Sequence, residues 1–260
     1  MLILLPPSEG KATPPAGGPV DLEALSFPTL TPARRTMVDA LARLSLGRPS
    51  RARATLGLSV RQDDELARNR DLLHAVAAPA AEVYSGVLYD ALAYQALPAV
   101  ARRRLDEWVV ISSALWGAVR LTDAIPPYRL SGDVTLPRVG KVSGFWRDPL
   151  GEVMPTAAEG QIVLDLRSAT YARLWSPREA VAERTVVGRV LQRRPDGSVT
   201  VVSHHNKATK GRLVASLARR STPRTLRQLA ENLARTGLEV DLVAPARGLP
   251  GRIDLVVNDL

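Results

Sequence analysis

The sequence predicts an α+β (mixed α/β) fold, in which one domain over residues 1–260 is built on a central mixed β-sheet with flanking helices. Three observations predict it. Apolar residues make up 45% of the 260-residue chain, which is enough to bury a sizeable core. Short apolar runs of strand length alternate with longer segments of helical periodicity. No internal repeat, low-complexity tail or clear linker divides the chain.

The first third of the chain predicts one strand followed by helices. Residues 2–5, LILL, form a short buried strand that Pro6 and Pro7 end. A loop rich in glycine and proline follows over residues 8–19. The first helix begins at Thr31-Pro32 and ends at Gly47, because proline suits the first helical position. Further helices are expected over 63–76 and, with a kink at Pro98, over 90–108.

The central third contains the best candidate for a central strand, residues 109–113. This strand ends in Ser112 and Ser113, and the carboxyl end of a buried strand is where open α/β sheets place ligands. The segment 122–138 is irregular and rich in proline. A short helix at 144–150, a strand at 162–165 and a helical SATYARLW segment follow.

The last third opens with the clearest hairpin, residues 184–203, in which Pro195-Asp196-Gly197 forms the turn between two alternating arms. Two helices are expected next, one over about 207–219 and one from Thr222-Pro223 to Gly237. Two short strands, 239–243 and 253–257, complete the predicted sheet.

The composition excludes several classes of function. The chain has no cysteine and three histidines, which rules out thiolate chemistry and leaves little basis for a metal site, so neither metal nor cofactor is expected. No apolar run is long enough to span a membrane, and MLILLPP is too short for a signal peptide, so we expect a cytoplasmic protein without a membrane partner. The formal charge of +9 favours a polyanion or a phosphorylated ligand, although codon bias toward arginine is an alternative explanation.

The four lysines are informative because 35 residues are basic and nearly all of them are arginine. Lysine offers a compact charge whose pKa burial can lower, so its retention in an arginine-rich chain indicates a specific need. The alternative is that four lysines remain by chance. All of them stand close to a glycine: Lys11, Lys141, Lys207 and Lys210.

Three segments have the polar density of a site: PPSEGK (6–11), SSALWGAVRLTDAIPPYRL (112–130) and SHHNKATKG (203–211). In the third, a helix begins directly after a strand, and Lys207 and Lys210 share one face of its first turn, where an anion is favoured. A capped surface helix with ordinary basic residues is the alternative. His204 and His205 point to opposite faces in strand geometry and cannot bind one metal together.

Taken together, these segments resemble the YaaA family of peroxide stress proteins, also catalogued as UPF0246 and DUF328. The resemblance runs from MLILLPPSEGK through YSGVLYDAL, SSALWGAVRLTDAIPPYRL, GKVSGFW and DLRSATY to HHNKATKG. It implies a positively charged cleft, a helix-hairpin-helix-like element, DNA binding and protection from hydrogen peroxide and iron damage. The shared positions are Lys11, Gly86, Tyr89, Ser113, Leu115, Gly117, Pro127, Tyr128, Arg129, Phe145, Trp146, Ser168, Tyr171, Lys207, Lys210 and Gly211.

Two functions follow as hypotheses. The first is a stress-protection protein that binds DNA with weak sequence preference through a basic cleft lined by Lys11, Arg129, Lys207 and Lys210. The second is an enzyme that acts on a nucleobase, a nucleotide or a phosphorylated small molecule, in which Lys207 or Lys210 holds the phosphate and Tyr128 or a lysine is the acid or base. The remaining candidate binding residues are Ser8, Tyr89, Ser113, Trp146, Ser168, Tyr171 and Gly211.

Overall fold

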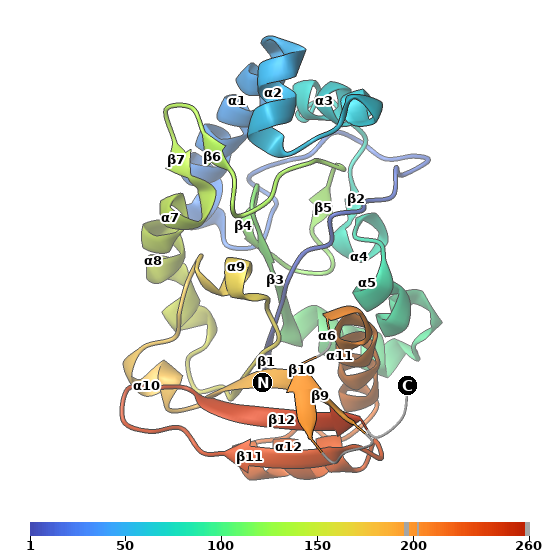
Figure 1. Ribbon diagram of the computed structural model, residues 1–260, viewed down its shortest axis with the longest axis vertical. Helices are drawn as coiled ribbons and strands as arrows, with labels where there is room; N and C mark the ends of the chain where they lie inside the picture. The colour runs from blue at the N-terminus through green and yellow to red at the C-terminus, as the bar shows by residue number, and fades with distance from the viewer. Residues whose placement is uncertain (195–197, 202, 258–260) are drawn as a thin grey trace.

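The computed structural model describes residues 1–194, 198–201 and 203–257 (Figure 1). The fold is mixed α/β with a central mixed sheet, as the sequence predicts. The strands of the sheet lie in the order β11 (Glu239–Val243), β12 (Gly251–Val257), β9 (Thr185–Arg193), β8 (Val163–Asp165), β1 (Leu2–Leu5), β3 (Val109–Ser113) and β4 (Gly117–Val119), and β10 (Val199–Val201) pairs with β9.

The middle of the sheet is parallel and its edges are antiparallel. β12, β9, β8, β1 and β3 run in one direction, whereas β11, β10 and β4 pair antiparallel with their neighbours. Every residue of β1, β8 and β3 is buried, which explains why these strands read as continuous apolar runs. Because the three strands are parallel, the polar residues that follow their carboxyl ends meet at one edge of the sheet.

The N-terminal helices lie at one end of the molecule, at the top of Figure 1. The first, α1 (Thr31–Leu46), has the predicted bounds and buries an apolar face that includes Met37, Val38, Leu41 and Leu44. The sequence analysis missed α2 (Pro49–Leu56), whose arginine-rich sequence has no clear apolar period. It ends at Gly57, which adopts the left-handed conformation with φ 66°. The next helix, α3 (Asp63–Arg70), is shorter than predicted.

The helix predicted over 90–108 is broken rather than kinked. It consists of α5 (Val87–Leu92), the 3-10 helix η3 (Tyr94–Ala96) and α6 (Ala99–Trp108). Ala93 ends α5 with a left-handed φ of 47°. Pro98 then restricts Leu97 to extended backbone, with ψ 147°, so that the helical hydrogen bonds cannot continue.

The C-terminal elements confirm the hairpin and move one helix start. β9 and β10 are antiparallel, while the predicted turn at 195–197 lies outside the described residues. The helix after it, α11 (Ser203–Ala218), begins four residues before the predicted start at Lys207. Lys207 and Lys210 therefore do not lie on the first turn of this helix, which corrects the geometry that suggested a helix-terminal anion site. The last helix, α12 (Leu226–Ala234), is capped by Thr225.

Short elements complete the fold: β2 (Ala78–Pro79), β5 (Ala124–Ile125), β6 (Thr135–Leu136), β7 (Gly140–Lys141), α4 (Ala80–Val83), α7 (Val142–Phe145), α8 (Arg147–Ala157), α9 (Ala169–Ala172), α10 (Glu179–Ala182), η1 (Pro28–Leu30) and η2 (Val60–Gln62). One hydrophobic cluster extends from β1 to β12. Within the described part of the chain, no helix is both long and apolar enough to cross a membrane.

Candidate functional site

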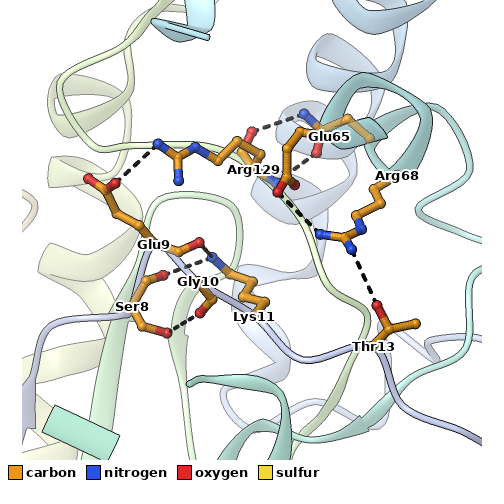
Figure 2. A network of polar contacts seen from close by, with 9 residues as sticks. Ser8, Glu9, Gly10, Lys11, Thr13, Glu65, Arg68 and Arg129 are labelled. Atoms are coloured by element: carbon orange, nitrogen blue, oxygen red, sulfur yellow. Dashed lines mark hydrogen bonds and ion pairs between the residues drawn. The ribbon is translucent and has the colours of Figure 1, made fainter. Parts of the chain in front are cut away.

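The polar edge of the sheet brings together two of the three polar segments that the sequence analysis singled out. Lys11, in the loop after β1, forms an isolated β-bridge with Tyr84. Its Nζ donates hydrogen bonds to the carbonyl oxygens of Ser8, at 2.8 Å, and Glu9, at 3.4 Å (Figure 2). The same nitrogen lies 4.1 Å from the ring centroid of Tyr128, a residue of the second segment. We call this cluster the Lys11 centre.

The carboxylates near Lys11 are bound by arginines. Glu9 pairs with Arg129 at 3.1 Å, and Glu65 of α3 pairs with Arg68 at 3.2 Å, as Figure 2 shows. Lys11 itself has no ion pair with a described residue. Burial and then the charge of Arg129 lower the pKa of Lys11 to about 7, although Glu65 and Glu9 act in the opposite direction.

A chain of buried hydroxyl groups lies beneath the lysine. Ser113 Oγ, at the end of β3, accepts the backbone N–H groups of Leu115 at 3.2 Å and Trp116 at 3.0 Å. It lies 2.7 Å from Tyr128 Oη, which lies 2.9 Å from Tyr84 Oη. Because both lone pairs of Ser113 are occupied, its hydroxyl donates to Tyr128, which in turn donates to Tyr84.

Burial raises the pKa of both tyrosines, Tyr84 and Tyr128, above the ordinary value of a phenol. Each therefore stays neutral at physiological pH and acts as a hydrogen-bond donor rather than as a base. This narrows the predicted acid or base role of Tyr128 to that of an acid, and the occupied lone pairs of Ser113 imply that its proton is directed at Tyr84.

Arg129 is positioned by a clamp on its own backbone. The side chain of Asn69, fully buried on α3, accepts the Arg129 N–H at 2.8 Å and donates to the Arg129 carbonyl oxygen at 2.9 Å. Two hydrogen bonds from one planar amide fix the two peptide units on either side of the Arg129 Cα, and with them the direction of the Arg129 side chain. The sequence analysis did not identify Asn69, because nothing in a short polar helix marks one buried amide.

Lys210 belongs to a second cluster, at the end of β8. Its Nζ donates to the carbonyl oxygen of Leu166 at 2.9 Å, and burial lowers its pKa while Asp165 opposes the shift. Asp165 forms a buried bidentate pair with Arg167, at 2.9 and 2.7 Å. Lys210 therefore ties α11 to the sheet, and its ammonium group is directed at the protein.

Several predicted binding residues form the framework of this edge. Tyr89 Oη donates to the carbonyl oxygen of Pro6 at 2.8 Å, and the buried Trp146 Nε1 donates to Ala114 at 2.8 Å. A Cβ on Gly211 would overlap the Leu88 carbonyl oxygen and lie 2.8 Å from Leu92 N, so this glycine allows α11 to pack closely on α5.

The structure thus gathers only part of the predicted site. Three of the four cations of the predicted cleft already have protein partners: Lys11, Arg129 and Lys210. Lys207 is exposed on α11. Of the residues near 168–171, Ser168 is exposed before α9 and Tyr171 is half-buried, with a pKa that burial raises to about 12. The side chains of His204 and His205 lie outside the described part of the structure.

A second candidate surface lies between α1, α2 and the turn of the β6–β7 hairpin. Here a cavity of about 970 Å³ is lined by four arginines and one carboxylate, Asp39. We call it the arginine groove; its cations are Arg43, Arg48, Arg51 and Arg138. Arg43 pairs loosely with Asp39, at 3.9 Å, whereas the other three are exposed and form no ion pair with a described residue. The sequence analysis missed this surface because α2 itself was missed.

Comparison with known proteins agrees with the resemblance seen in the motifs. A family model described as "Peroxide stress protein YaaA" matches residues 1–241. A UPF0246 protein of Streptomyces coelicolor is 48% identical over 262 residues, covering 100% of both chains. A UPF0246 protein of Corynebacterium glutamicum is 40% identical, over 96% of this chain and 94% of the relative. One from Corynebacterium efficiens is 41% identical, over 93% of this chain and 95% of the relative.

Proposed function

The chain belongs to the family of peroxide stress proteins YaaA, and from this premise we propose that it protects DNA during peroxide stress by binding the phosphate backbone through the arginine groove. The observation that carries the proposal is the cavity of about 970 Å³ with four arginines and a single carboxylate. Guanidinium groups bind phosphate oxygens with planar, bidentate geometry, and each one neutralises a backbone charge.

One feature supports this location over the cleft that the sequence suggested. Arg48 and Arg51, at the start of α2, and Arg138, in the β6–β7 turn, have no carboxylate partner among the described residues, so their charge is available to a ligand.

The test is the salt dependence of binding to a short duplex, measured by fluorescence anisotropy. A plot of log affinity against log salt has a negative slope. In the variant Arg48→Gln/Arg51→Gln/Arg138→Gln this slope should become shallower by about 2.7, since each phosphate contact contributes about 0.9. A matched control, Arg103→Gln/Arg224→Gln/Arg247→Gln, removes the same charge from exposed sites elsewhere and should leave the slope within error.

Equal losses in the two triple variants would mean that net charge alone attracts DNA, and would reject the groove. Absence of binding by the unmodified chain at low salt would reject DNA as the partner. We expect weak sequence preference, because a backbone-directed site carries no base readout. Any effect on intracellular iron would then be indirect: it would follow from the prevention of DNA damage rather than from binding of iron.

A second candidate function is an enzyme that acts on a nucleobase, a nucleotide or a phosphorylated small molecule at the Lys11 centre. The observation that favours it is the Lys11 amine above a buried Ser113–Tyr128–Tyr84 hydroxyl chain, at the carboxyl ends of parallel strands. Incubation with a nucleotide panel, read by mass spectrometry and thermal shift, should show conversion or stabilisation that Lys11→Met removes. Lys207→Ala tests whether the exposed lysine holds the phosphate.

A further inference from the structure

We infer that Lys11 is a covalent nucleophile, whose amine forms an imine with the carbonyl carbon of a hydroxyl-bearing aldehyde. The inference rests on the second candidate function and deepens it, because it names the reacting atom and the class of ligand. It is independent of DNA binding by the arginine groove.

The surroundings of Lys11 differ from those of a lysine that serves as a counter-ion. Two carboxylates come near it, yet Arg129 binds Glu9 and Arg68 binds Glu65, so the amine faces carbonyl oxygens instead (Figure 2). A lysine that only balanced charge would pair with one of these acids. The arrangement instead keeps the positive charges on the arginines, which cannot lose a proton, and leaves the lysine as the group that can.

The hydrogen bonds of Lys11 suit a neutral amine. A neutral amine has two protons, and the carbonyl oxygens of Ser8 and Glu9 supply two acceptors, at 2.8 and 3.4 Å. In this state its lone pair accepts no hydrogen bond from a donor of the loop. Burial lowers the pKa of Lys11 to about 7, so roughly half of the molecules carry the nucleophilic form at neutral pH.

The groups packed against Lys11 account for this balance. Burial and Arg129 favour the neutral amine, while Glu9 and Glu65 favour the ammonium. The rings of Tyr128 at 4.1 Å and Tyr84 at 5.4 Å also favour a cation, but both phenols are themselves neutral. The reactive state therefore depends on the arginines holding the two carboxylates away from the amine.

The reaction balances without a cofactor or an oxidant. The nitrogen lone pair attacks the carbonyl carbon, and the carbon–oxygen double bond becomes a single bond in a carbinolamine. The carbon–oxygen bond then breaks, and the two protons of the neutral amine leave with the oxygen as water. A carbon–nitrogen double bond remains on Lys11, and water reverses the reaction by the same steps.

The polar groups beside Lys11 indicate which aldehydes suit it. Glu9 and Arg129 neutralise each other beside the amine, and the hydroxyl of Ser8 lies in the same loop. Neutral polar surroundings suit hydroxyl groups on the ligand better than a second charge. Two sources offer this chemistry: a free sugar-like aldehyde, and the open-chain deoxyribose of a site in DNA that has lost its base.

The experiment traps the imine by reduction. The full chain is incubated near neutral pH with glycolaldehyde and cyanoborohydride, which adds a hydride to the imine carbon and makes the bond permanent, and the labelled peptides are mapped by mass spectrometry. We expect labelling of Lys11 at about tenfold or more the rate of the exposed Lys141, because an ordinary lysine is almost fully protonated at this pH. The rate at Lys11 should rise with pH and level off above about 7.

The variant Lys11→Arg keeps the positive charge, cannot form an imine and should lose the fast label.

A parallel incubation with a duplex that contains one baseless site identifies the source of the aldehyde. A trapped protein–DNA complex favours damaged DNA, and labelling by glycolaldehyde alone favours a free aldehyde. Labelling of Lys11 no faster than Lys141 and Lys207 would overturn the inference. This comparison of labelling rates is made on the unmodified chain, so it tests the inference even if the Lys11→Arg variant does not fold. Nucleotide conversion without a trapped adduct would retain the enzyme and reject the imine.

Discussion

At the scale of single residues, Gly211 shows how a residue expected to bind a ligand can be required for packing. A side chain there would overlap the Leu88 carbonyl oxygen and approach Leu92 N to 2.8 Å, and backbone on a facing helix cannot move aside easily. We predict that Gly211→Ala lowers the free energy of unfolding by about 1–3 kcal/mol, the usual cost of overpacking. Urea denaturation measures the change.

The matched control is Gly151→Ala on α8, where a Cβ would meet nothing within 4 Å. Alanine has the higher helix propensity, so this variant should gain up to about 1 kcal/mol. If Gly211→Ala retained full stability and lost only DNA or ligand affinity, the packing role would be wrong and the anion-binding role suggested by the sequence would be supported.

The charge of Lys11 makes a separate prediction about pH. In the unfolded chain this lysine keeps its proton up to about pH 10.5, whereas in the folded protein its pKa is about 7. Between these values the unfolded state binds more protons, so the free energy of unfolding rises with pH. We predict that the stability of the unmodified chain relative to Lys11→Met increases from pH 7 to about 10 and is flat below.

Urea denaturation of both proteins across this pH range tests the prediction, because titration of every other group cancels in the difference. A constant difference between the two proteins would mean that Lys11 titrates as in solvent. That result would also remove the neutral amine on which imine formation depends.

At the scale of elements, Asn69 connects α3 to the segment that carries Tyr128 and Arg129. Its amide satisfies both the N–H and the carbonyl oxygen of Arg129, at 2.8 and 2.9 Å. We predict that Asn69→Ala lowers the free energy of unfolding by about 2–4 kcal/mol, since it leaves two backbone groups without partners. Urea denaturation measures the loss. Ala67→Ser, at an exposed position on the same helix, should change stability by less than about 0.5 kcal/mol.

The Asn69→Ala variant also tests whether Asn69 positions Arg129, separately from its contribution to the stability of the fold. Asn69→Ala should also weaken the Arg129–Glu9 pair and leave Glu9 freer to approach Lys11, which would raise the pKa of the amine. The pH at which Lys11 becomes reactive in the trapping assay should therefore move upward. An unchanged profile would show that Arg129 is held by its surroundings without the clamp.

The elements that the sequence predicted well are those that a local pattern determines. β1 and β3 appear as apolar runs because both of their faces are buried, and the periodic face of α1 marks its length. The break near Pro98 follows from the restriction that proline places on Leu97, which the sequence indicated only as a kink. The early start of α11 has no signal in the periodicity of the sequence. α2 was missed because its stability comes from contacts with α1 and α3 rather than from an apolar stripe.

At the scale of the whole molecule, part of the site could be predicted from the topology of the sheet and part could not. Parallel strands bring their carboxyl ends together, so the meeting of the loop after β1 with Ser113 was predictable. The partners of Lys11, Arg129 and Lys210 could not be predicted, because hydrogen bonds to carbonyl oxygens do not depend on the type of the accepting residue. Net charge indicated a polyanion without indicating which cations remain unpaired.

The two proposed sites are built from different elements, and this makes their activities separable. The arginine groove uses α1, α2 and the β6–β7 turn, whereas the Lys11 centre uses the loop after β1, α3 and the end of β3. We predict that the groove variant Arg48→Gln/Arg51→Gln/Arg138→Gln traps glycolaldehyde at Lys11 at the unmodified rate while its DNA affinity falls. Lys11→Arg should do the reverse, with DNA affinity within about twofold of the unmodified chain because the charge is kept. Anisotropy and peptide mapping on the same preparations measure both. A large loss of DNA affinity in Lys11→Arg would place the lysine on the path of the duplex, as the sequence alone suggested, and would join the two sites into one surface.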